Sequence, residues 1–163
     1  MTWGKESHAE HQQHKGTPMT SFTTAQLIER VFHRVAYVMH HMWQEDGCSD
    51  TRLLGEPLVP DKYVVVGESI RGSEYREHVI PRLVLCDECL AMFSRRESIE
   101  AVAKFLQENL KIVRISRAER HMLDSSSQLN LRQRMPDDWN FSSGDPFVRL
   151  KLANIEFRKS GDT

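Results

Sequence analysis

The sequence has no apolar run near the roughly 18 residues that a membrane-spanning helix needs, and residues 1–20 lack the apolar segment of a secretory signal. Cysteine is also scarce, with three among 163 residues. A small, odd number of cysteines in a chain of this length argues against a disulfide framework and favours a reducing compartment. We therefore expect a soluble, cytoplasmic protein with no membrane partner.

Neither sign of charge is in excess, because 22 basic residues face 23 acidic ones and the net charge is -1. The molecule as a whole is no polycation, so any nucleic-acid binding requires a local basic patch. The hydrophobic fraction of 39% is ordinary for a globular protein, and the length fits one domain. We predict a disordered polar tail over residues 1–21 and a single domain over residues 22–163.

Histidine recurs at every third position of the tail, at His8, His11 and His14. This spacing would bring the three side chains near one another on a transient helix. A solvated tail and a metal site both fit the pattern, and we interpret it as a solvated tail.

The periodicity of apolar residues predicts several helices and a few short strands. Thr23 and Gln26 have capping-box spacing, and Ser116 is a natural N-cap. Ser94 and Glu97 also have capping-box spacing. The predicted helices cover residues 24–44, 82–95, 99–108, 117–123 and 147–155. The predicted strands cover residues 63–66, 75–80 and 110–115. The expected fold class is α+β, with a long N-terminal helix.

Cys86 and Cys89 form a CxxC pair. A structural zinc ion would need two more ligands, of which Cys48 is one candidate, and there is no second CxxC. A zinc-stabilised interaction module and a redox pair remain alternatives. We interpret both thiols as small apolar residues of the core, because the spacing places them on one helix face.

Three short motifs follow one another in the order strand, strand, helix. The first is Glu77-His78-Val79-Ile80-Pro81, an acid and a histidine at a strand end before two apolar residues and proline. The second is Asn109-Leu110-Lys111-Ile112-Val113. The third is Ala118-Glu119-Arg120-His121 on the predicted helix that follows.

This order resembles the HNH nucleases of the His-Me finger superfamily, whose fold is a ββα-metal core. The resemblance covers about residues 67–124. It implies a metal-binding hydrolase: an endonuclease that uses a divalent ion (Mg²⁺, Mn²⁺ or Zn²⁺) to cleave phosphodiester bonds in DNA. It further implies that His78 is the general base, that Asn109 orients His78, and that Glu77 and His121 bind the metal.

The chemistry suits these residue types. A divalent ion held by a carboxylate and an imidazole polarises the scissile phosphate, and a neutral histidine can take a proton from water. The spacing, however, places Arg120 near the usual ligand position on the helix. His121 comes one residue later, which is a rotation of about 100°.

Arginines surround these motifs, and we predict that five of them bind nucleic acid: Arg76, Arg82, Arg114, Arg117 and Arg120. Such a surface would hold a phosphate backbone largely without regard to sequence. An ordinary solvated face with ion pairs would have a similar composition.

The function predicted from the sequence is therefore a metal-dependent, DNA-binding HNH-like endonuclease. The alternative is a catalytically inactive, nuclease-like binding or regulatory protein that acts through macromolecular interaction. Arg120, the modest net charge and the amphipathic helix at residues 24–44 favour that alternative. The same helix could bind a protein partner or a second copy of the chain.

Overall fold

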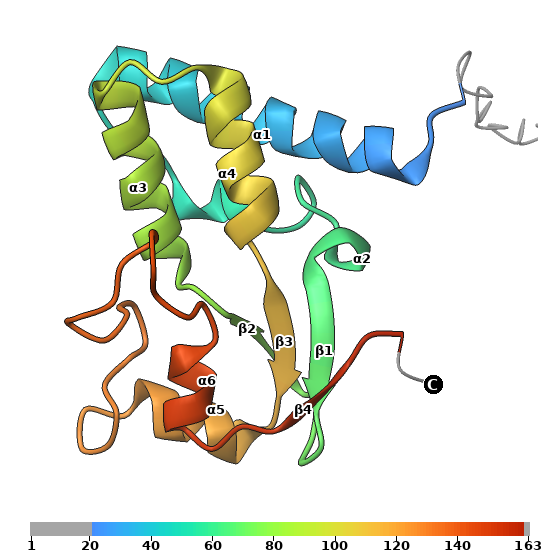
Figure 1. Ribbon diagram of the computed structural model, residues 1–163, viewed down its shortest axis with the longest axis vertical. Helices are drawn as coiled ribbons and strands as arrows, with labels where there is room; N and C mark the ends of the chain where they lie inside the picture. Colours follow the sequence, from blue (N-terminus) through green and yellow to red (C-terminus); the bar gives the residue numbers. More distant parts are fainter. Residues whose placement is uncertain (1–20, 162–163) are drawn as a thin grey trace, which may run out of the picture.

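The computed structural model describes residues 21–161, and the predicted polar tail with its three histidines lies outside this range except for Ser21. Figure 1 shows a helical part at the top, built from α1 (Thr24–Asp46), α3 (Arg82–Ser94) and α4 (Ile99–Asn109). A small sheet lies below it, beside α5 (Arg117–Asp124) and α6 (Val148–Leu152). The expected α+β class and the long N-terminal helix are confirmed.

The sheet has four strands in the order β2-β3-β1-β4. The strands are β1 (Val65–Ser69), β2 (Tyr75–His78), β3 (Ile112–Ile115) and β4 (Phe157–Lys159). β3 runs parallel to β1 and antiparallel to β2. β4 is antiparallel to β1. Two short helical segments, η1 (Thr51–Leu54) and α2 (Asp61–Val64), lead from α1 into the sheet.

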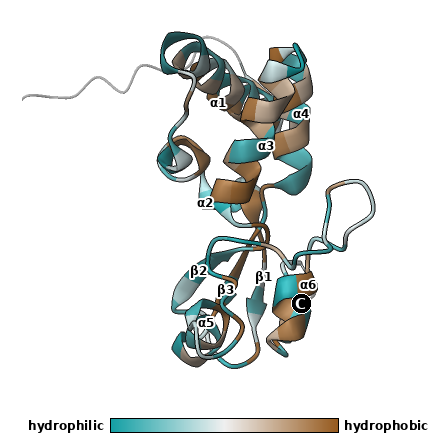
Figure 2. Cartoon of the chain, turned by 90° about the vertical axis from the view of Figure 1, so that its left-hand side faces the viewer, coloured by the Kyte–Doolittle hydropathy of each residue, from teal (hydrophilic) through white to brown (hydrophobic). Residues whose placement is uncertain are grey.

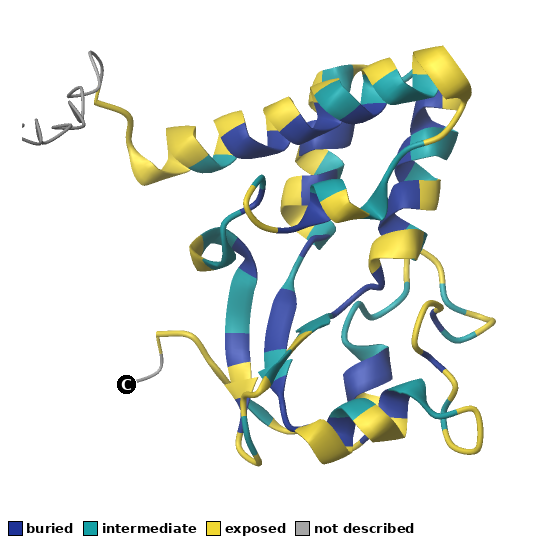
Figure 3. Ribbon diagram, turned by 180° about the vertical axis from the view of Figure 1, so that it is seen from behind, coloured by how far each residue is buried: buried dark blue, intermediate teal, exposed yellow. Residues whose placement is uncertain are grey.

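The long helix begins where the sequence predicts. Thr23 and Gln26 form the full capping box, and Gly47 ends the helix with φ of 68°, a conformation that glycine adopts without strain. Val31, Phe32, Val35, Ala36 and Met39 form its buried stripe. Leu27, one turn before Val31 on the same face of the helix, is exposed instead. Figure 3 shows why: the first turns of α1 are largely exposed where the helix extends beyond its neighbours.

Two apolar cores meet at the sheet. One fills the helical part and includes Ile80 and Ile112. The other lies between the sheet, α5 and α6 and includes Val79 and Val113. Neighbouring residues of one strand thus enter different cores, as the two-residue period of extended chain requires. In Figure 2, β3, which supplies residues to both cores, is largely brown, whereas the polar strand β2 is largely teal.

Three local predictions are wrong. Tyr63 and Val64 belong to α2, and the strand begins only at Val65. The N-cap of α4 is Ser98, not Ser94, which is still part of α3. The last helix is limited to Val148–Leu152, because Ala153 and Asn154 turn the chain toward β4, which was not predicted.

Within residues 21–161, no helix is both long and apolar enough to cross a membrane.

Candidate functional site

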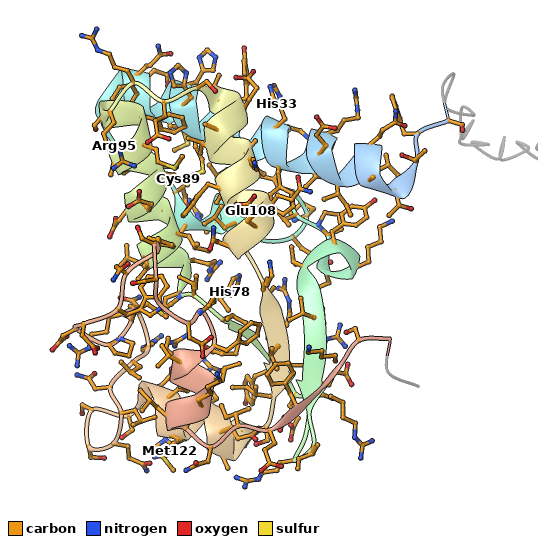
Figure 4. The ribbon with its side chains drawn as sticks, in the orientation of Figure 1. His33, His78, Cys89, Arg95, Glu108 and Met122 are labelled. Carbon is orange, nitrogen blue, oxygen red and sulfur yellow. The ribbon has the colours of Figure 1, made fainter. Side chains whose placement is uncertain are left out.

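A polar cleft of about 430 Å³ opens at the end of β2, where the sheet meets the helical part. In Figure 4, His78 lies near the middle of the molecule, between α3 and the sheet. The residues that line the cleft come from five segments: Thr51, Tyr75, Arg76, Glu77, His78, Pro81, Arg82, Leu83, Arg120, Asp124, Arg132 and Gln133. Segments far apart in sequence thus converge on the Glu77-His78 pair.

The end of β2 is fixed by burial on both sides. Glu77 pairs with Val113 and His78 with Ile112 across the antiparallel β2-β3 ladder. The next two residues, Val79 and Ile80, are fully buried in the two different cores. Pro81, whose ring fixes φ, is the N-cap of α3, so the chain passes directly from the strand end into the helix. The two polar residues therefore have little freedom to move.

Glu77 lies on the α6 side of the strand and is paired with a buried cation. Its Oε1 accepts a hydrogen bond from Nη2 of Arg149 at 3.0 Å, and its side chain is only 14% exposed. Burial raises the pKa of Glu77 above its ordinary value, and the Arg149 charge opposes that rise. The carboxylate is thus already engaged by the protein itself.

Arg149 is fully buried, which is rare for arginine and demands a partner for each donor. Its Nε donates to the Leu131 carbonyl at 2.9 Å. Its Nη1 donates to the carbonyl of His78 at 2.8 Å and, at 3.4 Å, to that of Val79. One side chain therefore connects α6 with the end of β2 and with the loop at Leu131.

His78 faces the opposite side of the strand, toward η1. Its Nε2 lies 3.4 Å from the Leu54 carbonyl oxygen. Burial, followed by the positive charge of Arg82, lowers the pKa of His78 to about 4. The imidazole is therefore neutral at pH 7 and a weaker base than an exposed histidine.

Four arginines line the cleft, but two of them are already paired. Arg76 pairs with Asp61. Arg120 pairs with Asp124 at 3.4 Å, and its guanidinium lies 4.6 Å from the ring centre of Tyr75. Within the described part of the chain, Arg82 and Arg132 form no side-chain hydrogen bond or ion pair, and both are exposed. Two guanidinium groups without a close ion-pair partner among the described residues thus face one polar cleft.

The structure does not bring all the predicted site residues together. Glu77 and His78 line the cleft with Arg76, Arg82 and Arg120. Asn109, in contrast, ends α4 and donates its side-chain amide to the Phe105 carbonyl at 2.9 Å. It does not line the cleft, so its predicted role of orienting His78 has no support in this geometry.

The other predicted residues also lie outside the cleft. His121 is exposed on α5, next to Met122, which Figure 4 places at the far end of the sheet part from His78. Arg117 is exposed on the same helix. Arg114 lies on β3 with ion pairs to Asp61 and Glu68, both at 3.6 Å. The cleft side of α5 instead presents Arg120 and Asp124.

These positions do not fit the divalent ion that the resemblance implies. Glu77 is bonded to Arg149, and Arg120 occupies the helix face where a ligand would be needed. His121 follows Arg120 on α5 and does not line the cleft, so it does not reach a metal bound beside Glu77. Across residues 21–161, no three histidine, cysteine, aspartate or glutamate side chains are grouped closely enough to hold a metal.

The predicted site residues did not include Tyr75, Arg132 or, above all, Arg149. Arg132 lies in a polar loop, where an arginine is unremarkable. Arg149 lies in the predicted helix at residues 147–155, where an arginine ordinarily faces solvent. No local signal marks either of them; only the tertiary contacts of α6 do.

The cysteines lie apart from the cleft. Cys86 and Cys89 are buried in the helical core, as predicted, and Cys48 is exposed. Burial raises the pKa of both core thiols. They therefore pack as apolar residues.

No protein-family model, no curated protein and no solved structure matches this chain.

Proposed function

We propose that this protein binds the phosphate backbone of nucleic acid in the cleft at the end of β2, on an HNH-like scaffold. One observation carries the proposal: four arginines from separate segments line a single cleft, and two of them, Arg82 and Arg132, have no partner among the described residues. An unpaired, exposed guanidinium needs only a modest loss of hydration to bind an anion.

The chemistry of arginine favours phosphate as the bound group. Its planar guanidinium forms paired hydrogen bonds to phosphate oxygens and is always charged. Only two carboxylates line the same cleft, and each is already paired: Glu77 with Arg149 and Asp124 with Arg120. An approaching phosphate therefore meets a net positive field although the whole chain has a net charge of -1.

The arrangement of β2, β3 and α5 supports nucleic acid as the macromolecule. The two strands are antiparallel, and the helix that follows β3 packs against β2. This is the strand-strand-helix order on which the resemblance to HNH nucleases was based, with Glu77-His78 at the end of the first strand. In this proposal the scaffold and its phosphate surface are retained without the family's metal site.

A second candidate function is endonucleolytic cleavage. The observation that favours it is the position of His78, which lines the cleft beside Arg76 and Arg82. A neutral imidazole beside a bound phosphate could take a proton from water. Nicking of a supercoiled plasmid in the presence of Mg²⁺ or Mn²⁺, lost in His78→Ala, would establish this function; no nicking by the wild type would exclude it.

The proposed binding is tested by fluorescence anisotropy with a labelled 20-nucleotide DNA, single-stranded or double-stranded, and the full chain. Arg82→Gln combined with Arg132→Gln should weaken binding at least tenfold, since both lost charges face the cleft. The matched control is Arg71→Gln combined with Arg117→Gln, which removes the same charge from exposed arginines outside the cleft.

The control pair should stay within about twofold of the wild type, a difference below roughly 0.4 kcal/mol. Equal losses in both double variants would mean that binding follows overall charge and not the cleft. Binding of an acidic peptide but not of DNA would contradict the choice of partner.

A further inference from the structure

We infer that the guanidinium of Arg149 takes the place that a divalent ion would have beside the Glu77 carboxylate. Nucleic-acid binding in the cleft is therefore independent of metal. The part of this inference that concerns nucleic-acid binding rests on the proposed function. The inference concerns a residue that does not touch the ligand, because Arg149 is fully buried behind the strand. Arg149 is thus a positioning residue.

Arg149 and a metal ion would compete for the same carboxylate. The guanidinium already donates to Oε1 of Glu77 at 3.0 Å. A divalent ion bound to this carboxylate would lie beside a fixed positive charge with little water to screen it. The remaining charged groups near Glu77 are Asp124 and Arg120, which are paired with each other. No free acid is left there to complete a ligand set.

Arg149 cannot easily withdraw from Glu77. Its other donors are bonded to the backbone carbonyls of His78, Val79 and Leu131. A rotation that freed Glu77 would leave several buried acceptors and a buried charge without partners, which proteins avoid. The pair is therefore a permanent part of the fold and not a gate.

The same contacts determine the shape of the cleft. Glu77 and His78 line the cleft from the end of β2, and Arg132 and Gln133, which directly follow Leu131, line it from a loop. Arg149 donates hydrogen bonds to the backbone of both segments, at His78 and at Leu131. It therefore places Arg132 opposite the end of β2, whereas Arg82 is placed independently by α3.

The metal arm of the test uses MnCl₂ alone, titrated into the wild-type chain by calorimetry, with Glu77→Gln as the comparison. We expect no saturable binding by either protein. Saturable Mn²⁺ binding that Glu77→Gln abolishes would overturn the inference, because Glu77 would then be a free ligand.

The binding arm repeats the DNA titration in EDTA and in Mg²⁺ at matched ionic strength. The two dissociation constants should agree within about threefold; a tenfold or larger loss in EDTA would overturn the inference. If no condition supports DNA binding, the proposed function fails, and the Mn²⁺ titration still decides whether Arg149 excludes metal.

The positioning role is tested by coupling. Arg149→Lys keeps the charge but cannot make every hydrogen bond. In that background, Arg132→Gln should weaken DNA binding less than twofold further, because Arg132 is already misplaced. Arg82→Gln should still have its full effect. Equal, additive effects of both substitutions would contradict the positioning role. Should Arg149→Lys fail to fold, the Mn²⁺ and EDTA comparisons, made with the folded wild type, still decide the inference.

Discussion

Replacement of Arg149 by methionine should be among the most destabilising substitutions in this chain. Methionine keeps much of the side-chain volume and removes the charge and every donor. Glu77 would then be a buried carboxylate without its cation, and the Leu131 carbonyl would lose its Arg149 donor. Breaking a buried ion pair by removing one partner typically costs about 3–5 kcal/mol.

Urea unfolding followed by circular dichroism measures this loss. With an m-value of about 2 kcal/mol/M for a domain of this size, the midpoint should fall by roughly 2 M without a change in m. The exposed Arg117→Met is the matched control and should leave the midpoint unchanged.

A double variant separates two contributions to the lost stability: the unpaired charge of Glu77 and the other contacts that Arg149 makes. Glu77→Met added to Arg149→Met should recover part of the loss, since neither charge then remains buried; coupling of about 1–3 kcal/mol is expected for residues in direct contact. A single Arg149→Met variant within about 1 kcal/mol of the wild type would refute the view that this pair holds the cleft together.

Two further predictions concern protonation and thiol access. The folded-state pKa of His78, about 4, lies below its ordinary value of 6.5, so protonation favours the unfolded chain. The free energy of unfolding of the wild type relative to His78→Asn should be constant above about pH 7 and should fall by up to about 3 kcal/mol as the pH drops from 6.5 toward 4. Urea midpoints of both proteins at several pH values measure this change. A difference between the two proteins that does not vary with pH would contradict the prediction. Cys48 should react at once with a thiol reagent, while Cys86 and Cys89 react only on unfolding; rapid reaction of all three would contradict their burial.

The elements that the sequence predicted well are those with strong local signals. Thr23 and Gln26 mark the start of α1, and Ser116 with Glu119 marks the start of α5, because capping boxes depend only on nearby residues. The strand at Glu77-His78 was also predictable, since β-branched residues and a proline follow it. Local signals of this kind therefore predict where a helix begins or a strand ends.

The rest depended on tertiary contacts that no local pattern encodes. Ser94 and Glu97 match the capping-box spacing equally well, yet Ser94 ends α3 while Glu97 pairs with Arg95. The short strand β4 pairs with the edge of β1 that β3 leaves free, a contact that no local pattern in residues 157–159 indicates. In the site, the pairing of Glu77 with Arg149 spans 72 positions, and no pattern near Glu77 in the sequence indicates this partner.

Amide and arginine side-chain NMR signals, followed during titration with a short DNA, test the central claim most directly. The account predicts that the Nε–H signals of Arg82 and Arg132 shift together, along with the backbone amides at the end of β2. The Arg71 and Arg117 signals should stay unchanged. Shifts confined to surfaces away from the cleft, or equal shifts of all exposed arginines, would contradict the assignment of this cleft as the phosphate-binding site.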